Sequence, residues 1–336
     1  MTKQASIVDP YWDALGGGER YAAAVARLLI KLGYQVDICW PSSIADQINQ
    51  RFDIDISAAN FVSEPNLNGD LVFWISDGSI PTSLAKKTII HFQVPFHDQN
   101  SGSITNRLKI KLYTVVCNSQ FTKSFIDKTY RVSSQVIYPP VAVESFKPGE
   151  KMNQIVSVAR FSQALHAKRQ DILLKAFSQL QLPGWKLVLA GGVEDQNYLA
   201  SLHQQAQGLE VKFVANPTAA QVRQLMSQAK LFWSATGFDI AADKFPEKVE
   251  HFGITPVEAM AAGCVPIVTA IGGHKETVIN GATGYWWNTI GELLDFSTKL
   301  ANDSQLWEKL SQQAISHSQK FSTQVFESHM TTLIQA

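Results

Sequence analysis

The sequence predicts an α/β protein made of two Rossmann-like domains that face each other across a crevice. First, its 336 residues are more than a single hydrophobic core usually organises. Second, hydrophobic residues make up 45% and charged residues 17% of the chain, which is the balance of a globular protein. Third, short β-rich runs alternate with helix-length segments in two series, as in parallel sheets built from βαβ units.

The first series predicts an N-terminal domain over residues 1–148. Four helices are expected near residues 19–32, 42–50, 104–112 and 119–129. They lie among six predicted strands, which are SIVD (6–9), QVDICW (35–40), DLVFWIS (70–76), KTIIHFQ (87–93), YTVVCNS (113–119) and QVIYP (135–139).

The second series predicts a C-terminal domain over residues 149–320. The polar segment 144–153 separates the two series and fits an interdomain linker. Five strands are predicted, at QIVSVAR (154–160), WKLVLAG (185–191), VKFVAN (211–216), KLFWSA (230–235) and VPIVTA (265–270). Helices are expected near residues 168–180, 194–207, 218–228, 255–262, 290–302, 304–318 and 322–334. The last of these, within residues 321–336, is expected to pack back on the N-terminal domain.

Charge and cysteine content restrict the class of protein. Lys plus Arg and Asp plus Glu number 29 each, so the basic excess of a nucleic-acid-binding protein is missing. Cys39, Cys117 and Cys264 lie far apart in apolar stretches, which predicts buried free thiols and a reducing, cytoplasmic location. No secretory signal or run of about 20 apolar residues is present, so no membrane span is expected.

A glycine loop follows the first predicted strand. Gly16, Gly17 and Gly18 come directly before a helix-forming segment, so their backbone N–H groups could bind a phosphate at the helix N-terminus. The alternative is a tight turn that needs glycine for its backbone conformation. The loop matches neither the dinucleotide-binding fingerprint nor a P-loop.

Two cations frame the start of the second domain. Arg160 ends the strand QIVSVAR, and Lys168 lies near the start of the next predicted helix. Cations are disfavoured at a helix N-terminus, so an anionic ligand such as a diphosphate would offset their cost. The alternative is that both are ordinary solvated charges.

Two glutamates, Glu250 and Glu258, lie eight residues apart. On one helix that spacing is about 12 Å, too far for the carboxylate pair of a retaining glycosidase. Thr255 and Glu258 also fit a capping box with Pro256 at the first helical position, which would make the role of Glu258 structural.

Taken in order, the motifs resemble the family 4 retaining glycosyltransferases of the two-domain GT-B fold over nearly the whole chain. They are GGGER, IIHFQVPF, VVCNSQFTKSF, VIYPPV, VARFSQALHAKRQDILLKAF, EHFGITPVEAMAAGCVPIV and GGHKETV. The resemblance implies that the first domain binds the acceptor and the second a nucleotide-sugar donor. The eight-residue spacing from Arg160 to Lys168 is wider than in many relatives and implies a longer loop.

The resemblance also implies the roles of the site residues. Arg160 and Lys168 would clamp the diphosphate leaving group, and Glu250 and His91 would contact the transferred sugar. Glu258 would hold the ribose hydroxyls, and the glycine loop would line a phosphate. The donor-binding set is completed by Phe252, Gly253, Ile254 and Thr255, of which Gly253 and Ile254 offer backbone N–H groups.

The implied reaction is a metal-independent front-face transfer of a hexose, with mannose or glucose favoured. The donor would be GDP- or UDP-linked, no cofactor would be needed, and the acceptor would be a saccharide or a lipid-linked saccharide. The D-x-D string Asp53-Ile54-Asp55 lies away from these motifs and is not expected to bind Mg²⁺. A nucleotide-sugar epimerase and a non-catalytic nucleotide-sugar binding protein are the alternatives.

Residues 86–131 form a basic segment. Lys86, Lys87, Arg107, Lys109, Lys111, Lys123, Lys128 and Arg131 stand against Asp98 and Asp127. Such a face could hold the protein at an anionic membrane, on its inner side, with each basic residue worth about 1 kcal/mol. The alternative is a solvated face of a neutral protein.

Overall fold

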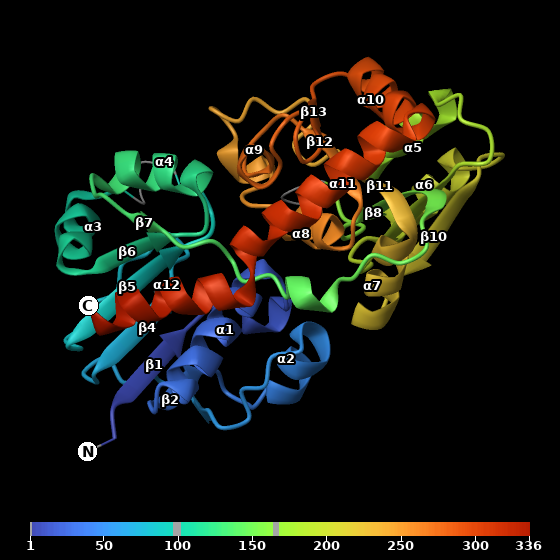
Figure 1. The fold of residues 1–336 in the computed structure, drawn as a ribbon. Coiled ribbons are helices and arrows are strands. Elements are labelled where there is room, and N and C mark those ends of the chain that lie inside the picture. The colour runs from blue at the N-terminus through green and yellow to red at the C-terminus, as the bar shows by residue number, and fades with distance from the viewer. Residues whose placement is uncertain (1, 97–101, 164–167) are drawn as a thin grey trace. The chain divides into compact units, whose positions relative to one another are not determined.

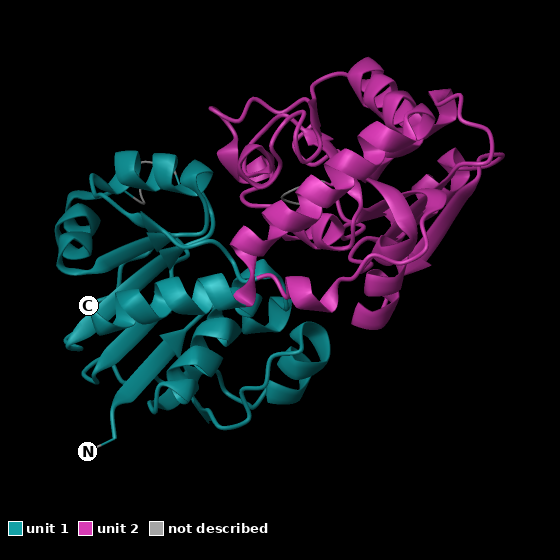
Figure 2. Cartoon of the chain, in the orientation of Figure 1, with its two compact units in different colours: residues 1–140, 324–336 teal, residues 141–323 magenta. Residues whose placement is uncertain are grey.

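The computed structural model describes residues 2–96, 102–163 and 168–336, which form two compact units (Figures 1 and 2). Unit 1 comprises Met1–Pro140 and Gln324–Ala336, and unit 2 comprises Val141–Thr323. The chain therefore enters unit 2 at Val141, ahead of the predicted linker, and its last helix belongs to unit 1.

Unit 1 is built on seven parallel strands in the order β3-β2-β1-β4-β5-β6-β7. Its strands are β1 Gln4–Val8, β2 Gln35–Cys39, β3 Asn60–Val62, β4 Leu71–Ile75, β5 Lys87–Phe92, β6 Thr114–Cys117 and β7 Gln135–Val136. Its helices are α1 Gly17–Lys31, α2 Ala45–Phe52, α3 Ile104–Lys109 and α4 Gln120–Tyr130, with 3₁₀ turns η1 Trp12–Ala14 and η2 Ile110–Leu112. The strand order reverses between β1 and β4, where open parallel sheets bind ligands.

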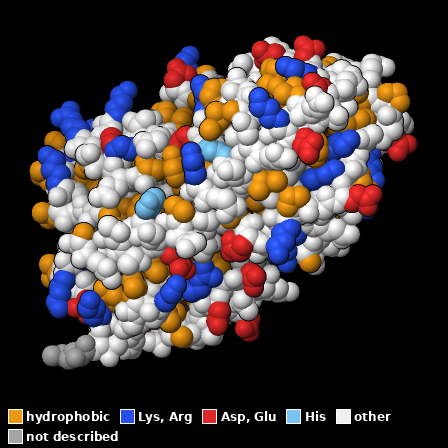
Figure 3. Space-filling view, viewed as in Figure 1, with side chains coloured by type: hydrophobic (Ala, Val, Ile, Leu, Met, Phe, Trp, Pro, Cys, Tyr) orange, Lys and Arg blue, Asp and Glu red, His pale blue; other side chains and the backbone are white. Residues whose placement is uncertain are grey.

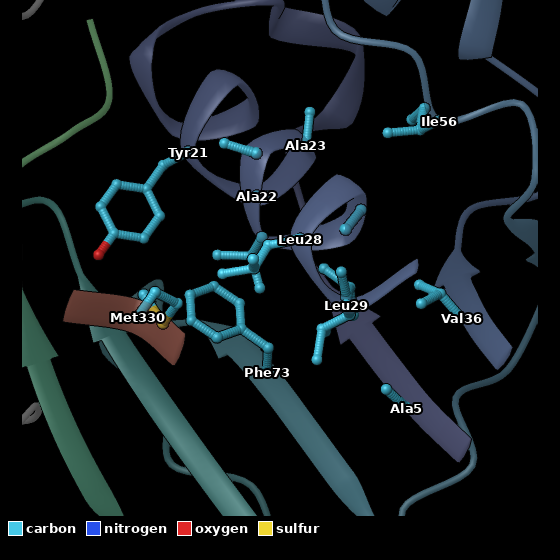
Figure 4. Packing of buried hydrophobic residues seen from close by; sticks show 14 of the residues in the cluster. Ala5, Tyr21, Ala22, Ala23, Leu28, Leu29, Val36, Ile56, Phe73 and Met330 are labelled. Atoms are coloured by element: carbon cyan, nitrogen blue, oxygen red, sulfur yellow. The ribbon is translucent and has the colours of Figure 1, made fainter. Parts of the chain in front are cut away.

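The core of unit 1 lies between α1 and the sheet (Figure 4). A run of alanines, Ala22 to Ala24, lets α1 approach the strands closely, and Leu28 and Leu29 fill the space that remains. The C-terminal helix α12, Thr323–Gln335, adds Met330 beside Phe73 of β4. The first and last segments of the chain thus share one hydrophobic core.

Unit 2 repeats this plan with six parallel strands in the order β10-β9-β8-β11-β12-β13. Its strands are β8 Met152–Val158, β9 Lys186–Gly191, β10 Val211–Ala215, β11 Ala229–Ser234, β12 Val265–Thr269 and β13 Tyr285–Trp287. Its helices are α5 Gln170–Gln179, α6 Gln196–Gln205, α7 Ala219–Gln228, α8 Ile254–Ala261, α9 His274–Thr277, α10 Ile290–Asn302 and α11 Ser304–Ser318. The 3₁₀ turns are η3 Val143–Ser145, η4 Pro246–Lys248 and η5 Gln319–Phe321.

The predicted α/β class with two parallel sheets is confirmed. Two edge strands, β3 and β13, were not predicted from the sequence, because each has only three residues and shows no periodic pattern. The three cysteines are free, as expected, although Cys39 is half-buried and not buried like the other two.

Candidate active site

In unit 2, three of the four charged residues predicted for the site lie on connections that leave the central strands. Arg160 follows β8, Lys168 lies two residues before α5, and Glu250 lies on the segment that leads into α8. Residues 164–167, between the two cations, lie outside the described residues. The positions match the rule that ligands of such sheets bind beyond the strands' carboxyl ends.

Lys168 and Glu250 form an ion pair. The Lys168 Nζ atom lies 2.8 Å from Glu250 Oε2, and the two side chains are only 18% and 19% exposed. Burial alone would raise the pKa of Glu250, but the attraction and hydrogen bond from Lys168, together with the nearby His274 and His251, outweigh burial and hold that pKa well below its ordinary value. The Glu250 carboxyl is therefore ionised at neutral pH.

Two glycines fix the backbone around Glu250. The Gly273 N–H donates to the Glu250 carbonyl at 2.7 Å. A Cβ atom on Gly272 would lie 2.2 Å from that same carbonyl oxygen, and one on Gly273 would lie 2.4 Å from the Cα of Phe252. Any larger residue would force the Glu250 segment and the glycine turn apart.

His274 follows these glycines and was not singled out from the sequence. Its ring is fully buried, and its Nδ1 lies 3.0 Å from the Thr269 hydroxyl. That hydroxyl donates to the Thr236 carbonyl at 2.6 Å, so Nδ1 must carry the proton and Nε2 a lone pair. Burial lowers the pKa of His274 to about 4 even though Glu250 opposes the change, so the ring is neutral. The Gly272-Gly273 pair that precedes His274 is the sequence feature from which its place in the site could have been predicted.

Arg160 binds a carboxylate that the sequence analysis did not single out. Its Nη1 lies 2.6 Å from Glu194 Oε1, and both side chains keep 44% of their exposure. An exposed pair of this kind contributes at most about 1 kcal/mol. Arg160 can therefore exchange Glu194 for the oxygen of a phosphate at low cost. The structure places Arg160 in a different ion pair from Lys168.

The start of α8 differs from the predicted capping box. Gly253, at φ +98°, is the N-cap, the helix begins at Ile254, and no side chain caps it. Thr255 is inside the helix, so the expectation that Thr255 and Glu258 form a capping box is wrong. Only glycine adopts that φ readily, which explains why the N-cap carries no hydroxyl.

The rest of the predicted donor-binding set lies around this helix start. Glu258 is buried within α8, and Ile254 and Thr255 are half-buried. The Phe252 side chain is buried against Phe321, with ring centroids 5.5 Å apart. What α8 offers a ligand at its start is thus backbone N–H groups and the positive end of a helix dipole.

In unit 1, the glycine loop is already bonded to an anion of its own chain. The Glu19 carboxylate, in the first turn of α1, accepts a hydrogen bond of 2.5 Å from the N–H of the N-cap residue Gly16. The Gly18 Cα faces the Gln93 side chain, since an added Cβ would lie 2.6 Å from Gln93 Nε2. Gly16, Gly17 and Gly18 could take a phosphate only by displacing Glu19, yet none of the three has the positive φ that a glycine-specific turn would require. The structure therefore leaves both readings of this loop open.

Asp9, directly after β1, adds a second buried carboxyl to this loop. Its Oδ1 accepts from the Tyr11 N–H at 2.9 Å, and its buried Oδ2 has no hydrogen-bond partner in the described part of the chain. Burial, reinforced by the nearby Glu19 charge, raises the pKa of Asp9 to about 7.

His91 does not reach a surface. The ring has no exposure, stacks on Tyr21 at 3.8 Å between centroids and lies near Phe73. Burial lowers its pKa to about 3, so it is neutral. The predicted contact between His91 and a sugar stays a prediction, and in this structure the enclosed ring offers no face for a ligand.

The remaining expectations concern metals and membranes. Among the described residues, no three His, Cys, Asp or Glu side chains gather into a possible metal site. Asp53 ends α2 with φ +59°, and Asp55 accepts from the Ser57 N–H, which makes the D-x-D string a surface turn. In residues 2–96, 102–163 and 168–336, no helix has both the length and the apolarity needed to cross a bilayer.

The features of unit 2 lie within a segment that known proteins share. Residues 142–317, more than half of the chain, match the family described as glycosyl transferases group 1. The chain belongs to that family. The predicted relation to glycosyltransferases of GT-B type is thereby confirmed, while the numbered family and the retaining stereochemistry stay predictions.

Relatives of this group 1 member include two named mannosyltransferases. The GDP-Man:Man(3)GlcNAc(2)-PP-Dol alpha-1,2-mannosyltransferase of Dictyostelium discoideum is 28% identical over 221 residues, covering 60% of this chain and 42% of that protein. The GDP-mannose:cellobiosyl-diphosphopolyprenol alpha-mannosyltransferase of Komagataeibacter xylinus is 33% identical over 141 residues, covering 40% and 32%. The matched part thus spans less than half the length of each relative.

Solved structures share the fold over almost the whole chain. A glycosyltransferase from Rickettsia africae aligns with a TM-score of 0.79 over 99% of this chain and 97% of its own, at 18% identity. HepE from Anabaena, solved with UDP-glucose, aligns with a TM-score of 0.72 over 100% of both chains, at 19% identity. At these identities the likeness concerns the fold alone.

Proposed function

We propose that the chain transfers a mannosyl group from GDP-mannose to a saccharide or lipid-linked saccharide acceptor, with retention and without a divalent metal. The observation that carries the proposal is the ionised Lys168–Glu250 pair beside the uncapped start of α8, inside the segment that matches the family. The relatives' names favour GDP-mannose over other nucleotide sugars.

The residues of unit 2 suit a diphosphate leaving group. Negative charge grows on that group as the bond to the sugar breaks. Lys168, Arg160 and the first N–H groups of α8 would stabilise it, and a preorganised donor of this type is typically worth about 10² to 10³ in rate. In a front-face reaction, the departing phosphate oxygen takes the proton of the acceptor hydroxyl while the new glycosidic bond forms on the same face.

Glu250 would serve the sugar. Lys168 keeps its carboxylate ionised, and an ionised carboxylate accepts hydrogen bonds from vicinal hydroxyl groups. The Gly272-Gly273 turn fixes its backbone, so the carboxylate is held ready at little entropic cost on binding. Glu258 is assigned to the ribose hydroxyls, following the resemblance.

The experiment is incubation of the purified chain with GDP-mannose, with or without a polyprenyl-diphosphate-linked saccharide, in the presence of EDTA. We expect a mannosylated product only with acceptor, and NMR of its anomeric proton should show the α configuration. Conversion of the sugar within the donor would instead indicate an epimerase. Donor binding without turnover across an acceptor panel would indicate a binding protein, and a β product would refute retention.

A further inference from the structure

Exposed positive charge alone does not mark a site in this protein. Lysine and arginine side chains are spread over both units on the face that Figure 3 shows. The Arg160 guanidinium is one more exposed cation of this kind, paired with Glu194. The backbone that carries it, however, is bonded to other segments of unit 2 on both sides.

On one side, the end of β8 lies against the segment that ends β9. The Ala159 N–H donates to the Ala190 carbonyl at 2.9 Å. The Phe161 N–H donates to the Gly192 carbonyl at 2.8 Å. A Cβ atom on Gly191, between these two acceptors, would lie 1.9 Å from the Ala159 carbonyl oxygen, so a larger residue would push the two segments apart.

On the other side, Gln170 bonds to the same backbone. It is the first residue of α5 and only 1% exposed. Its Nε2 donates to the Arg160 carbonyl at 3.0 Å and, less closely, to the Ala159 carbonyl at 3.4 Å. Arg160 and Lys168 both belong to the β8–α5 connection, so this side chain ties the end of that connection to its start.

Tyr198 of α6 determines how the Gln170 amide is oriented. The Tyr198 hydroxyl lies 3.2 Å from Gln170 Oε1 and 3.3 Å from Asp171 Oδ1, and it accepts from the Asp171 N–H. Burial raises the pKa of Tyr198 to about 12, so the hydroxyl keeps its proton and can donate. Because the hydroxyl lies at Oε1, Nε2 faces the carbonyls of β8. Asp171 in turn pairs at 3.1 Å with Arg169, the residue directly after Lys168.

We propose that Gln170 is a positioning residue for the transfer reaction, which orients the Arg160 guanidinium by fixing the carbonyl of the same residue. The inference rests on the proposed function, because it concerns the cation that would meet the diphosphate. A buried polar side chain is costly unless it is bonded, and α5 otherwise buries apolar residues such as Leu173 and Phe177. A displacement of about 1 Å can cost about 10²-fold in rate, so a shift of the Arg160 backbone should be visible in turnover.

The test compares kcat and KM for GDP-mannose in Gln170→Met and in a matched control, Gln154→Met. Gln154 lies on β8, is 3% exposed and donates through Nε2 to the Leu225 carbonyl at 3.3 Å. Urea unfolding should show similar losses of stability in the two variants, since each removes a buried amide. We expect kcat to fall about 10- to 100-fold in Gln170→Met and to keep its parental value in Gln154→Met. KM should change less, because the guanidinium meets charge that develops as the sugar bond breaks.

A double-mutant cycle shows whether Gln170 acts through Arg160. In the Arg160→Gln background, Gln170→Met should have almost no further effect on kcat, because the guanidinium that it orients is absent. Tyr198→Phe should lower kcat about threefold in the parent and leave it unchanged in the Arg160→Gln background. If Gln170→Met does not fold, Tyr198→Phe carries the same test, because its ring still fills the core.

Three results would overturn the inference. They are a parental kcat in folded Gln170→Met, an equal loss of kcat in Gln154→Met, and the same loss with and without the Arg160 guanidinium. The single variant Arg160→Gln separates this failure from failure of the proposed reaction. A loss of turnover in Arg160→Gln would leave the reaction standing without this role for Gln170, whereas unchanged turnover would refute the role of Arg160 itself.

Discussion

The connections that leave the first strands of the two sheets occupy the same topological position but carry opposite charge. In unit 1, Asp9 lies in the β1–α1 loop and Glu19 lies in the first turn of α1, where its carboxylate accepts from the N–H of the N-cap residue Gly16. In unit 2, the β8–α5 connection holds Arg160 and Lys168, and no side chain caps α5. One helix start is bonded to its own carboxylate, whereas the other is flanked by cations whose carboxylates come from distant segments.

This difference indicates where a phosphate would bind. A helix N-terminus attracts anions in general, but the attraction is already used where the chain supplies its own carboxylate. The run of glycines in the sequence indicated a phosphate site at the unit 1 loop, whereas the charges in the structure indicate one in unit 2. The difference in charge therefore supports the proposal that Arg160 and Lys168 bind the phosphate.

The largest effect should come from removing both cations of unit 2. In Arg160→Gln/Lys168→Gln, we expect kcat/KM for mannosyl transfer to fall by about 10⁴ or more, because each donor to the leaving group is worth about 10² to 10³. Steady-state kinetics with GDP-mannose would measure it. Lys175→Gln, on the exposed face of α5, is the matched control and should keep its activity.

Intact turnover in the folded double variant would contradict both the comparison and the proposed reaction. A fall in the control of the same size would mean that charge anywhere near α5 matters, and the specific assignment would then fail. Binding of GDP alone, followed by calorimetry, would separate loss of affinity from loss of chemistry.

The second effect concerns the acidic loop of unit 1. The folded-state pKa of Asp9, about 7, lies above its ordinary value of 3.8, so the native protein holds this proton more tightly than the unfolded chain. The contribution of this proton to the free energy of unfolding is complete below pH 4 and is lost as the pH rises toward and through 7. The difference between these two pKa values corresponds to at most about 4 kcal/mol of unfolding free energy.

Asp9→Asn removes this dependence, because an amide does not ionise and its oxygen can still accept from the Tyr11 N–H. We expect the variant to be more stable than the parent at pH 8 and to differ much less at pH 4.5, as measured by urea unfolding at both values. A constant difference between the two proteins across this range would show that Asp9 titrates normally in the fold.

Most of the fold followed from the sequence because periodicity and β-rich runs are local signals. The strands around Ile7, Phe73 and Val156 stood out in this way, and so did the motif that contains Glu250. The partners of the site residues could not be predicted from the sequence. Glu194 and Glu19 are ordinary glutamates until tertiary contacts bring them to Arg160 and Gly16. The enclosure of His91 could not be predicted for the same reason, because it depends on the ring of Tyr21 from α1.

A third and smaller effect tests the capped glycine loop. Glu19→Gln weakens the bond to the Gly16 N–H by removing its charge, which should cost about 1 kcal/mol of stability. If the loop is a self-capped turn, phosphate protection in a thermal-shift assay should stay unchanged. Stronger protection by phosphate in Glu19→Gln would show that Glu19 blocks a true phosphate site and would restore that role to the loop.

The smallest effect separates two meanings of the Arg160–Glu194 pair. If Glu194 merely occupies Arg160 until a diphosphate arrives, Glu194→Gln should tighten GDP binding a few-fold, since an exposed pair contributes at most about 1 kcal/mol. Stability should barely change for the same reason. Weaker GDP binding in calorimetry would mean instead that Glu194 orients the guanidinium toward the ligand. The carboxylate would then belong to the donor site, and the contrast with the self-capped loop of unit 1 would rest on Lys168 alone.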